Sequence, residues 1–220
     1  MKKSVLSILA LGIMLTACRE KTEDVSLVAQ VAHPTIGLIG TPVFSTSVGS
    51  GTFTDPGAVG YNDLTGDSVP LSGPISNNVD LSTPGFYSVV WSYTVNNGYV
   101  DFTTNRSRLV LVTPVDPNAD YSGVYARTSN GVLVNFTKVG PGLYTTDNIG
   151  GVGGIPDYIF TVYLGQVSDT TLEAPPQPNP LGGEVTIVNG TFTVSATDTT
   201  YSYIVDGAGF AFNVRTFSHQ

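Results

Sequence analysis

The sequence predicts an all-β protein made of two antiparallel β domains. Short runs of β-branched and aromatic residues alternate with clusters of Gly, Pro, Asn and Asp, a pattern typical of strands joined by tight turns. The 25 glycines and 14 prolines among the 220 residues supply the turn chemistry that such a chain needs. Past the N-terminal region, no window of ten or more residues has a convincing apolar period of 3.6, so we expect no long helix there.

Residues 1–17 are expected to be a secretory leader. Two lysines precede an apolar run over residues 5–15, which is shorter than the roughly 20 residues that span a bilayer. The run ends in the tetrapeptide LTAC, whose Cys18 is the only cysteine of the chain. LTAC resembles the bacterial lipobox, and this resemblance implies that Cys18 is lipidated and becomes the mature N-terminus. A plain signal peptide followed by a chance cysteine is the alternative.

Residues 18–32 are expected to be a flexible tether. Its Lys21, Glu23 and Asp24 resemble the export signal of Bacteroidetes lipoproteins that reach the outer face of the outer membrane. A solvated spacer would have a similar composition, so the periplasmic and outer faces both stay open. Two or more acyl chains on Cys18 would hold the protein at the membrane without a transmembrane helix.

The charge of the chain argues against nucleic acid as a partner. Without the leader, seven basic and 17 acidic residues remain, a net charge of −10. DNA and other polyanions would be repelled by this balance. With Cys18 acylated no thiol is left for a disulfide, so we expect both domains to be held together by packing alone.

The first domain is expected to cover residues 33–114. Strands are predicted over residues 35–39, 43–48 and 86–95, with Trp91 on the apolar face of the third, where we expect it in the core. Asn97-Gly98 then predicts a type I′ hairpin turn. The last strand of this domain is predicted over residues 108–112.

Two segments of this domain carry a family resemblance. Residues 52–58 (TFTDPGA) and 80–89 (DLSTPGFYSV) resemble the conserved turns of bacterial Ig-like modules, which occur in adhesins, crystal toxins and Bacteroidetes surface lipoproteins. The resemblance implies an Ig-like β-sandwich. Asp55, Asp63 and Asp67 suggest calcium, but their spacing matches no calcium loop, and we interpret them as turn caps with no metal site.

Residues 115–118 are expected to be a short linker, stiffened by Pro117 and by Pro114 just before it. Residues 119–220 are expected to be a second antiparallel β domain, either a sandwich or a small barrel. Residues 121–127 (YSGVYAR) and 137–144 (TKVGPGLY) resemble the C-terminal domain of uncharacterised Bacteroidetes lipoproteins. The segment PPQPNP at 175–180 is interpreted as a stiff loop that cannot pair as an edge strand. Further strands are predicted over residues 132–137, 143–145, 158–164, 184–188, 191–196, 201–205 and 210–217, with Asn189-Gly190 as the turn of a hairpin.

No reaction centre is visible in the sequence. His33 lies at the start of the first domain and His219 one residue from the C-terminus, which disfavours a Ser-His-Asp triad or a histidine metal site. The glycines of residues 150–154 lack the spacing of a dinucleotide fingerprint, so no cofactor is expected. We therefore predict a protein that is not an enzyme.

The sequence favours a binding module at the cell surface. Sugar sites use exposed aromatic faces, and Tyr144 and Tyr163 are the candidates because each is expected on the outer face of its strand; plain coverage of a β surface is the alternative. The expected partners are the membrane, through the anchor, and a polysaccharide handled with an outer-membrane uptake complex. A structural or adhesive protein that binds another protein is a second possibility, and a hydrolase with an unrecognised site is a third.

Overall fold

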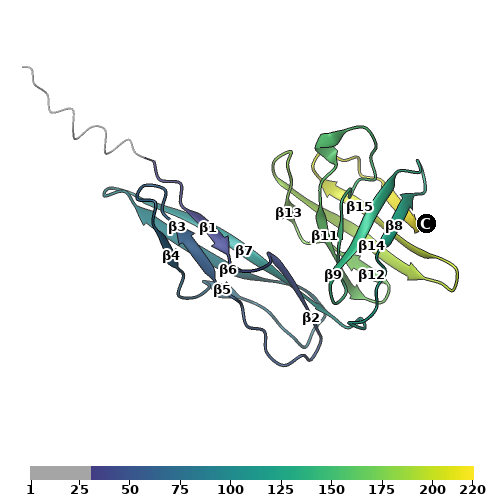
Figure 1. Cartoon of the computed structure of the whole chain (residues 1–220), viewed down its shortest axis with the longest axis horizontal. Coiled ribbons are helices and arrows are strands. Elements are labelled where there is room, and N and C mark those ends of the chain that lie inside the picture. Colours follow the sequence, from purple (N-terminus) through teal and green to yellow (C-terminus); the bar gives the residue numbers. More distant parts are fainter. Residues whose placement is uncertain (1–30) are drawn as a thin grey trace, which may run out of the picture.

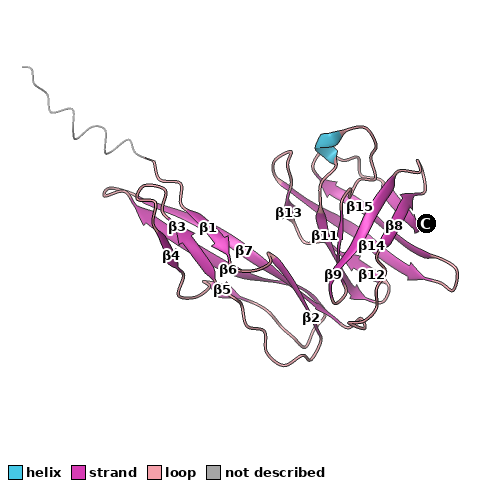
Figure 2. Ribbon diagram, viewed as in Figure 1, coloured by secondary structure: helices cyan, strands magenta, loops and turns pink. Residues whose placement is uncertain are grey.

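The computed structural model describes residues 31–220 and confirms the all-β prediction (Figures 1 and 2). Within this range the only helical element is a three-residue 3-10 turn, η1 (Pro156–Tyr158). The described residues contain no helix that is both long and apolar enough to cross a membrane. The predicted leader, Cys18 and the tether up to residue 30 lie outside the described residues.

The first domain consists of two sheets that enclose a small apolar core. Its core contains Ile36 and Ala58 from one sheet and Val89, Trp91 and Val110 from the other, so the predicted core position of Trp91 is confirmed. One sheet has the order β1-β3-β4, and the other has the order β2-β7-β6-β5, in which β2 and β7 run parallel. These strands are β1 (Thr35–Leu38), β2 (Val43–Ser47), β3 (Ala58–Tyr61), β4 (Ser68–Pro70), β5 (Ser76–Asn77), β6 (Gly85–Asn96) and β7 (Asp101–Thr113).

The turn between β6 and β7 differs from the prediction. Asn96 pairs with Asp101, so the hairpin closes over four residues and is not a two-residue type I′ turn. The side chain of Asn97 accepts hydrogen bonds from the backbone N–H groups of Tyr99 and Val100, and Gly98 has a positive φ of 95°. An asparagine side chain that caps the backbone in this way stabilises a longer loop.

The Asp-Pro-Gly turn is anchored by a buried arginine. Asp55 caps its own turn through the N–H of Gly57 at 2.7 Å, as expected, and its second oxygen accepts a hydrogen bond from Arg108 Nε at 2.8 Å. Arg108 is fully buried and also donates to the carbonyl oxygens of Ile39, Thr41 and Gly57. One side chain therefore joins β7 to two separate loops.

The second domain is a closed barrel, which decides between the two predicted architectures. Its sheet runs β12-β11-β10-β9-β8-β16-β15-β14, and a pairing of Thr171 in β12 with Thr191 in β14 closes the circle. The strand β13 is an extra edge beside β14. The strands are β8 (Gly123–Arg127), β9 (Leu133–Gly140), β10 (Leu143–Thr146), β11 (Val162–Ser168), β12 (Thr171–Glu173), β13 (Gln177–Pro178), β14 (Glu184–Val194), β15 (Thr199–Gly207) and β16 (Val214–His219).

Stacked aromatic rings fill the barrel. Phe136 lies against Tyr144 with centroids 4.4 Å apart and against Tyr201 at 4.8 Å, and Tyr201 lies against Phe217 at 4.9 Å. All four side chains are buried. A barrel of this size has an interior just wide enough to be filled by side chains, so this barrel has a packed core.

The hairpin predicted at Asn189-Gly190 is wrong. β14 continues through both residues, and the register against β15 shifts between Val188 and Thr191, which is a β-bulge. Asn189 has the positive φ of 54° that its turn chemistry favours, but the strand bends there and does not reverse. A Cβ on Gly190 would lie 2.2 Å from the carbonyl oxygen of Leu172, so only glycine lets β12 approach at the seam.

Candidate binding groove between the two domains

The two domains share an apolar contact. Val43 and Leu111 from the first domain form a buried cluster with Leu143 from the barrel. Thr113 Oγ1 donates a hydrogen bond to the carbonyl oxygen of Gln166 at 2.6 Å across the same junction. The barrel is therefore packed against the end of the β2-β7-β6-β5 sheet, and the linker is not the only connection between the domains (Figure 1).

Gly165 allows this close contact. A Cβ at Gly165 would lie 2.5 Å from the ring of Phe86 and 2.9 Å from Leu111. We expect Gly165→Val to force these side chains apart and to cost about 1–3 kcal/mol, the usual range for overpacking. Gly73→Val is the matched control, because no atom lies within 4 Å of the Cβ position of Gly73.

Limited proteolysis of the linker at residues 115–118 and small-angle scattering would measure the effect of Gly165→Val. Faster cleavage and a larger radius of gyration are expected for this variant and not for Gly73→Val. Equal behaviour of the two variants would show that the junction does not depend on this contact.

A groove of about 600 Å³ runs beside the junction. Tyr163 lies in it and is half-buried, on the outer face of β11 as predicted. The first domain contributes Pro42, Val43, Ser88, Asn105, Arg106, Ser107 and Leu109, and the barrel side contributes Thr161, Tyr163, Pro176, Gln177, Pro178 and Glu184.

Gln177 fixes the backbone beside Tyr163. Its Oε1 accepts a hydrogen bond from Tyr163 N–H at 2.9 Å, and its Nε2 donates to Tyr163 O at 2.9 Å. This side chain imitates the ladder of a neighbouring strand, and Gln177 and Pro178 also pair with β14. The interpretation of the proline-rich segment as a loop unable to pair is therefore wrong, because Gln177 supplies the pairing groups that its proline neighbours lack.

Polar side chains line the rest of the groove. Arg106 Nη1 donates to Ile36 O at 2.8 Å, which holds a positive charge at the groove wall. Asn105 and Glu184 are exposed, and within residues 31–220 neither side chain has a hydrogen-bond partner. An aromatic face combined with free amide and carboxylate groups can bind hydroxyl-rich ligands through stacking and hydrogen bonds.

Tyr144 does not belong to this site. Its side chain is fully buried inside the barrel and stacks on Phe136, so the prediction of an exposed ring at Tyr144 is wrong. The other face of β10 is also covered, because Leu143 packs against Val43 and Leu111 of the first domain. The structure thus keeps only Tyr163 of the two candidates in a position to meet a ligand.

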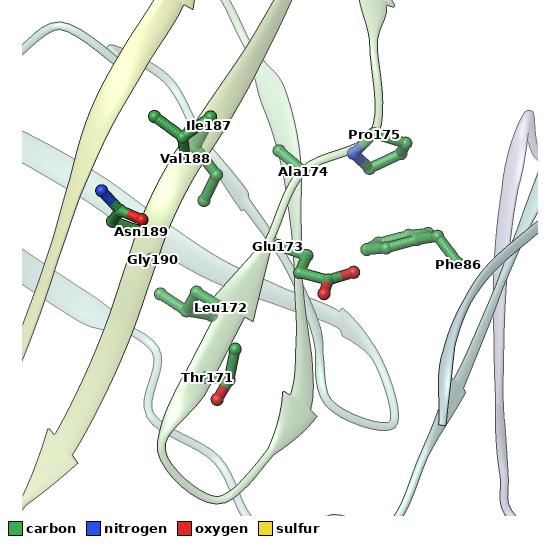
Figure 3. A pocket seen from close by; sticks show the side chains of 10 residues that line it. All are labelled: Phe86, Thr171, Leu172, Glu173, Ala174, Pro175, Ile187, Val188, Asn189 and Gly190. Atoms are coloured by element: carbon green, nitrogen blue, oxygen red, sulfur yellow. The ribbon is translucent and has the colours of Figure 1, made fainter. Parts of the chain in front are cut away.

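A second hollow of about 520 Å³ lies at the barrel seam (Figure 3). Figure 3 shows Phe86 reaching from the first domain toward Glu173 and Pro175, with Leu172 and Ile187 on the barrel side. Phe86 and Ser88 lie two residues apart on β6, and Pro175 and Pro176 are adjacent, so this hollow lies next to the Tyr163 groove. Together they suit an extended ligand better than a compact one.

The sequence could not indicate the other groove residues. Asn105 and Arg106 lie more than 55 residues away from Tyr163 in the chain, and they meet it only because the domains pack together. No group of three or more His, Cys, Asp or Glu that could hold a metal occurs in the described part of the chain. Asp55 accepts a hydrogen bond from Arg108 Nε, and Asp63 accepts a hydrogen bond from the backbone N–H of His33 at 2.6 Å.

Comparison with known proteins gives a likeness to solved structures alone. No protein-family model matches the chain, and no curated protein matches it. A crystal structure of a lipoprotein from Bacteroides thetaiotaomicron is similar at 20% identity, with a TM-score of 0.39, over 86% of this chain and 100% of that chain.

Proposed function

We propose that this protein is a lipid-anchored, non-catalytic binding protein of the bacterial outer membrane, and that the Tyr163 groove binds a stretch of polysaccharide. The observation that carries the proposal is the half-buried Tyr163 ring in a groove that also exposes Asn105, Arg106 and Glu184. A sugar ring packs its C–H face on an aromatic side chain while its hydroxyl groups bind the polar groups around it.

The proposed membrane anchor and the Tyr163 groove belong to opposite ends of the first domain. The described chain enters β1 from the side of the first domain that lies away from the barrel (Figure 1). The first domain would then act as a spacer between the membrane and the groove. Exposure on the outer face rests on the likeness of Lys21, Glu23 and Asp24 to an export signal, and work with an uptake complex rests on the family resemblance alone.

Replacing Tyr163 with alanine should abolish most glycan binding. Loss of a stacking ring is worth about 1 kcal/mol or more, so we expect at least a fivefold weaker affinity. Affinity gels that contain neutral polysaccharides, followed by titration with the best one, would measure this with the mature unlipidated chain. Tyr99→Ala is the matched control, because Tyr99 is 57% exposed and lies outside the groove.

Two outcomes of the Tyr163→Ala experiment would contradict glycan binding in the groove. Glycan retention that survives Tyr163→Ala unchanged would place the sugar elsewhere. Retention by no polysaccharide, together with specific co-purification of an outer-membrane protein that Tyr163→Ala disrupts, would mean that the groove binds protein.

A further inference from the structure

The turn between β6 and β7 presents two exposed apolar side chains. Tyr99 is 57% exposed, and its neighbour Val100 is 56% exposed. Both belong to residues 97–100, which we call the hairpin tip. Neither side chain lines the groove around Tyr163, so the hairpin tip has no part in the proposed glycan site.

The backbone N–H groups of the hairpin tip are all bonded within the hairpin. Asn97 N–H donates to Val100 O at 3.2 Å. Gly98 N–H donates to Asn96 Oδ1 at 2.6 Å. Tyr99 N–H and Val100 N–H both donate to Asn97 Oδ1, at 3.0 and 2.9 Å. A backbone donor without a partner is costly to remove from water, so the hairpin tip can meet an apolar surface without losing a hydrogen bond at any of these four donors.

The hairpin tip lies at the end of the first domain where the chain enters. β7 runs from Asp101, beside the tip, to Thr113 at the junction with the barrel, so at about 3.3 Å per residue the tip is about 40 Å from the junction. Figure 1 shows the hairpin ending on the side from which the described chain enters β1. There Ala32 is buried and His33 N–H donates to Asp63, which fixes the incoming chain to the domain.

The proposed lipid anchor would keep this end of the domain near a membrane. Residues 18–30 separate Cys18 from the described chain. A coil of that length spans about 20 Å, and a fully extended chain spans at most about 45 Å. The anchor would therefore give the hairpin tip a high effective concentration at the lipid surface. This step rests on the anchor in the proposed function and does not depend on glycan binding.

We propose that the hairpin tip docks on the lipid surface to which the chain is anchored, with the side chains of Tyr99 and Val100 in the interfacial layer. Tyrosine suits this layer because its ring is apolar and its hydroxyl group stays hydrated. Exposed carboxylates at the same end, on Asp63, Asp67 and Asp101, would be repelled by anionic headgroups, so the contact rests on the apolar side chains. It would point the barrel and its groove away from the membrane.

The test uses Val100→Cys, which provides the only free thiol of the chain once Cys18 is acylated. The lipidated protein is labelled there with a fluorophore and placed in phosphatidylcholine vesicles that contain a spin-labelled lipid as quencher. Ile75→Cys is the matched control, because Ile75 is 65% exposed and its N–H bonds Val90 O, well before the end of β6. Quenching should be about threefold or more stronger at position 100 than at position 75.

Two further measurements sharpen the test. Tyr99→Ser in the Val100→Cys background should lower the quenching about twofold, because it removes the ring that enters the interfacial layer. Vesicles that contain anionic lipid should quench the label less than phosphatidylcholine vesicles do.

Equal quenching of the two labelled variants, on vesicles that carry the lipidated chain, would overturn the contact and leave the anchor intact. A label at Val100→Cys that is shielded only after another membrane protein is added would mean that the hairpin tip binds protein. A chain without acyl mass on Cys18 would overturn the anchor and the contact together. Glycan binding is measured separately, with the unlipidated chain and Tyr163→Ala, so its failure is distinguishable from each of these results.

Discussion

Replacing Arg108 with alanine is expected to destabilise the first domain by about 3–5 kcal/mol, enough to unfold a domain of ordinary stability. The variant leaves Asp55 with a buried, unpaired carboxylate, since that side chain is only 8% exposed. It also removes donors from the carbonyl oxygens of Ile39, Thr41 and Gly57. Each buried acceptor that loses its donor adds a penalty of its own.

Denaturant unfolding followed by tryptophan fluorescence would measure this change in the first domain alone, because Trp91 is the only tryptophan and lies in that core. Arg106→Ala is the matched control: Arg106 is exposed and makes one hydrogen bond, to Ile36 O, so we expect a loss below about 1 kcal/mol. If Arg108→Ala shifts the unfolding midpoint no further than Arg106→Ala, the buried pair does not hold the turn.

Local patterns predicted most of the strands and several turns, because these depend on neighbouring residues. The strands predicted over residues 158–164 and 210–217 begin four residues later, at Val162 and Val214. The alternation around Trp91 placed it in the core, and Asp55 caps the turn that its Asp-Pro-Gly sequence indicates. Asn189-Gly190 shows the limit of such patterns. The same positive φ serves a hairpin turn and a bulge, and the choice is made by β12, whose Leu172 carbonyl touches Gly190 from another part of the chain.

The candidate site was less predictable because it depends on contacts between the domains. On β10 both faces are covered, Tyr144 by the barrel core and Leu143 by the first domain, so alternation could not tell which face is exposed. Barrel closure rests on the pairing of Thr171 with Thr191, which no local pattern indicates. Tyr163 was placed correctly because its strand has one face in the barrel and one face toward the groove.

The barrel is expected to unfold cooperatively between about pH 10 and pH 12. Burial raises the pKa of Tyr144 from 10.0 to about 12, and burial likewise raises the pKa of Tyr125, Tyr201 and Tyr203. In the unfolded chain these groups ionise near pH 10. Their contribution to stability is therefore complete below pH 10, falls as the unfolded state loses protons, and is lost as the pH rises through the folded values.

The free energy of unfolding should fall steeply with pH because several tyrosines ionise together on unfolding. Each tyrosine that stays protonated only in the folded state lowers the free energy of unfolding by about 1.4 kcal/mol per pH unit. Four such tyrosines lower it by roughly 5 kcal/mol per pH unit. Far-UV circular dichroism and tyrosinate absorbance should change at the same pH. Tyr201→Phe is the informative variant, because it removes one of the four ionising hydroxyl groups and keeps the ring that stacks on Phe136 and Phe217. It should leave stability at pH 7 equal or higher and raise the pH of unfolding, whereas a wild-type barrel still folded at pH 12, or a variant that unfolds at the same pH, would contradict this account of the aromatic core.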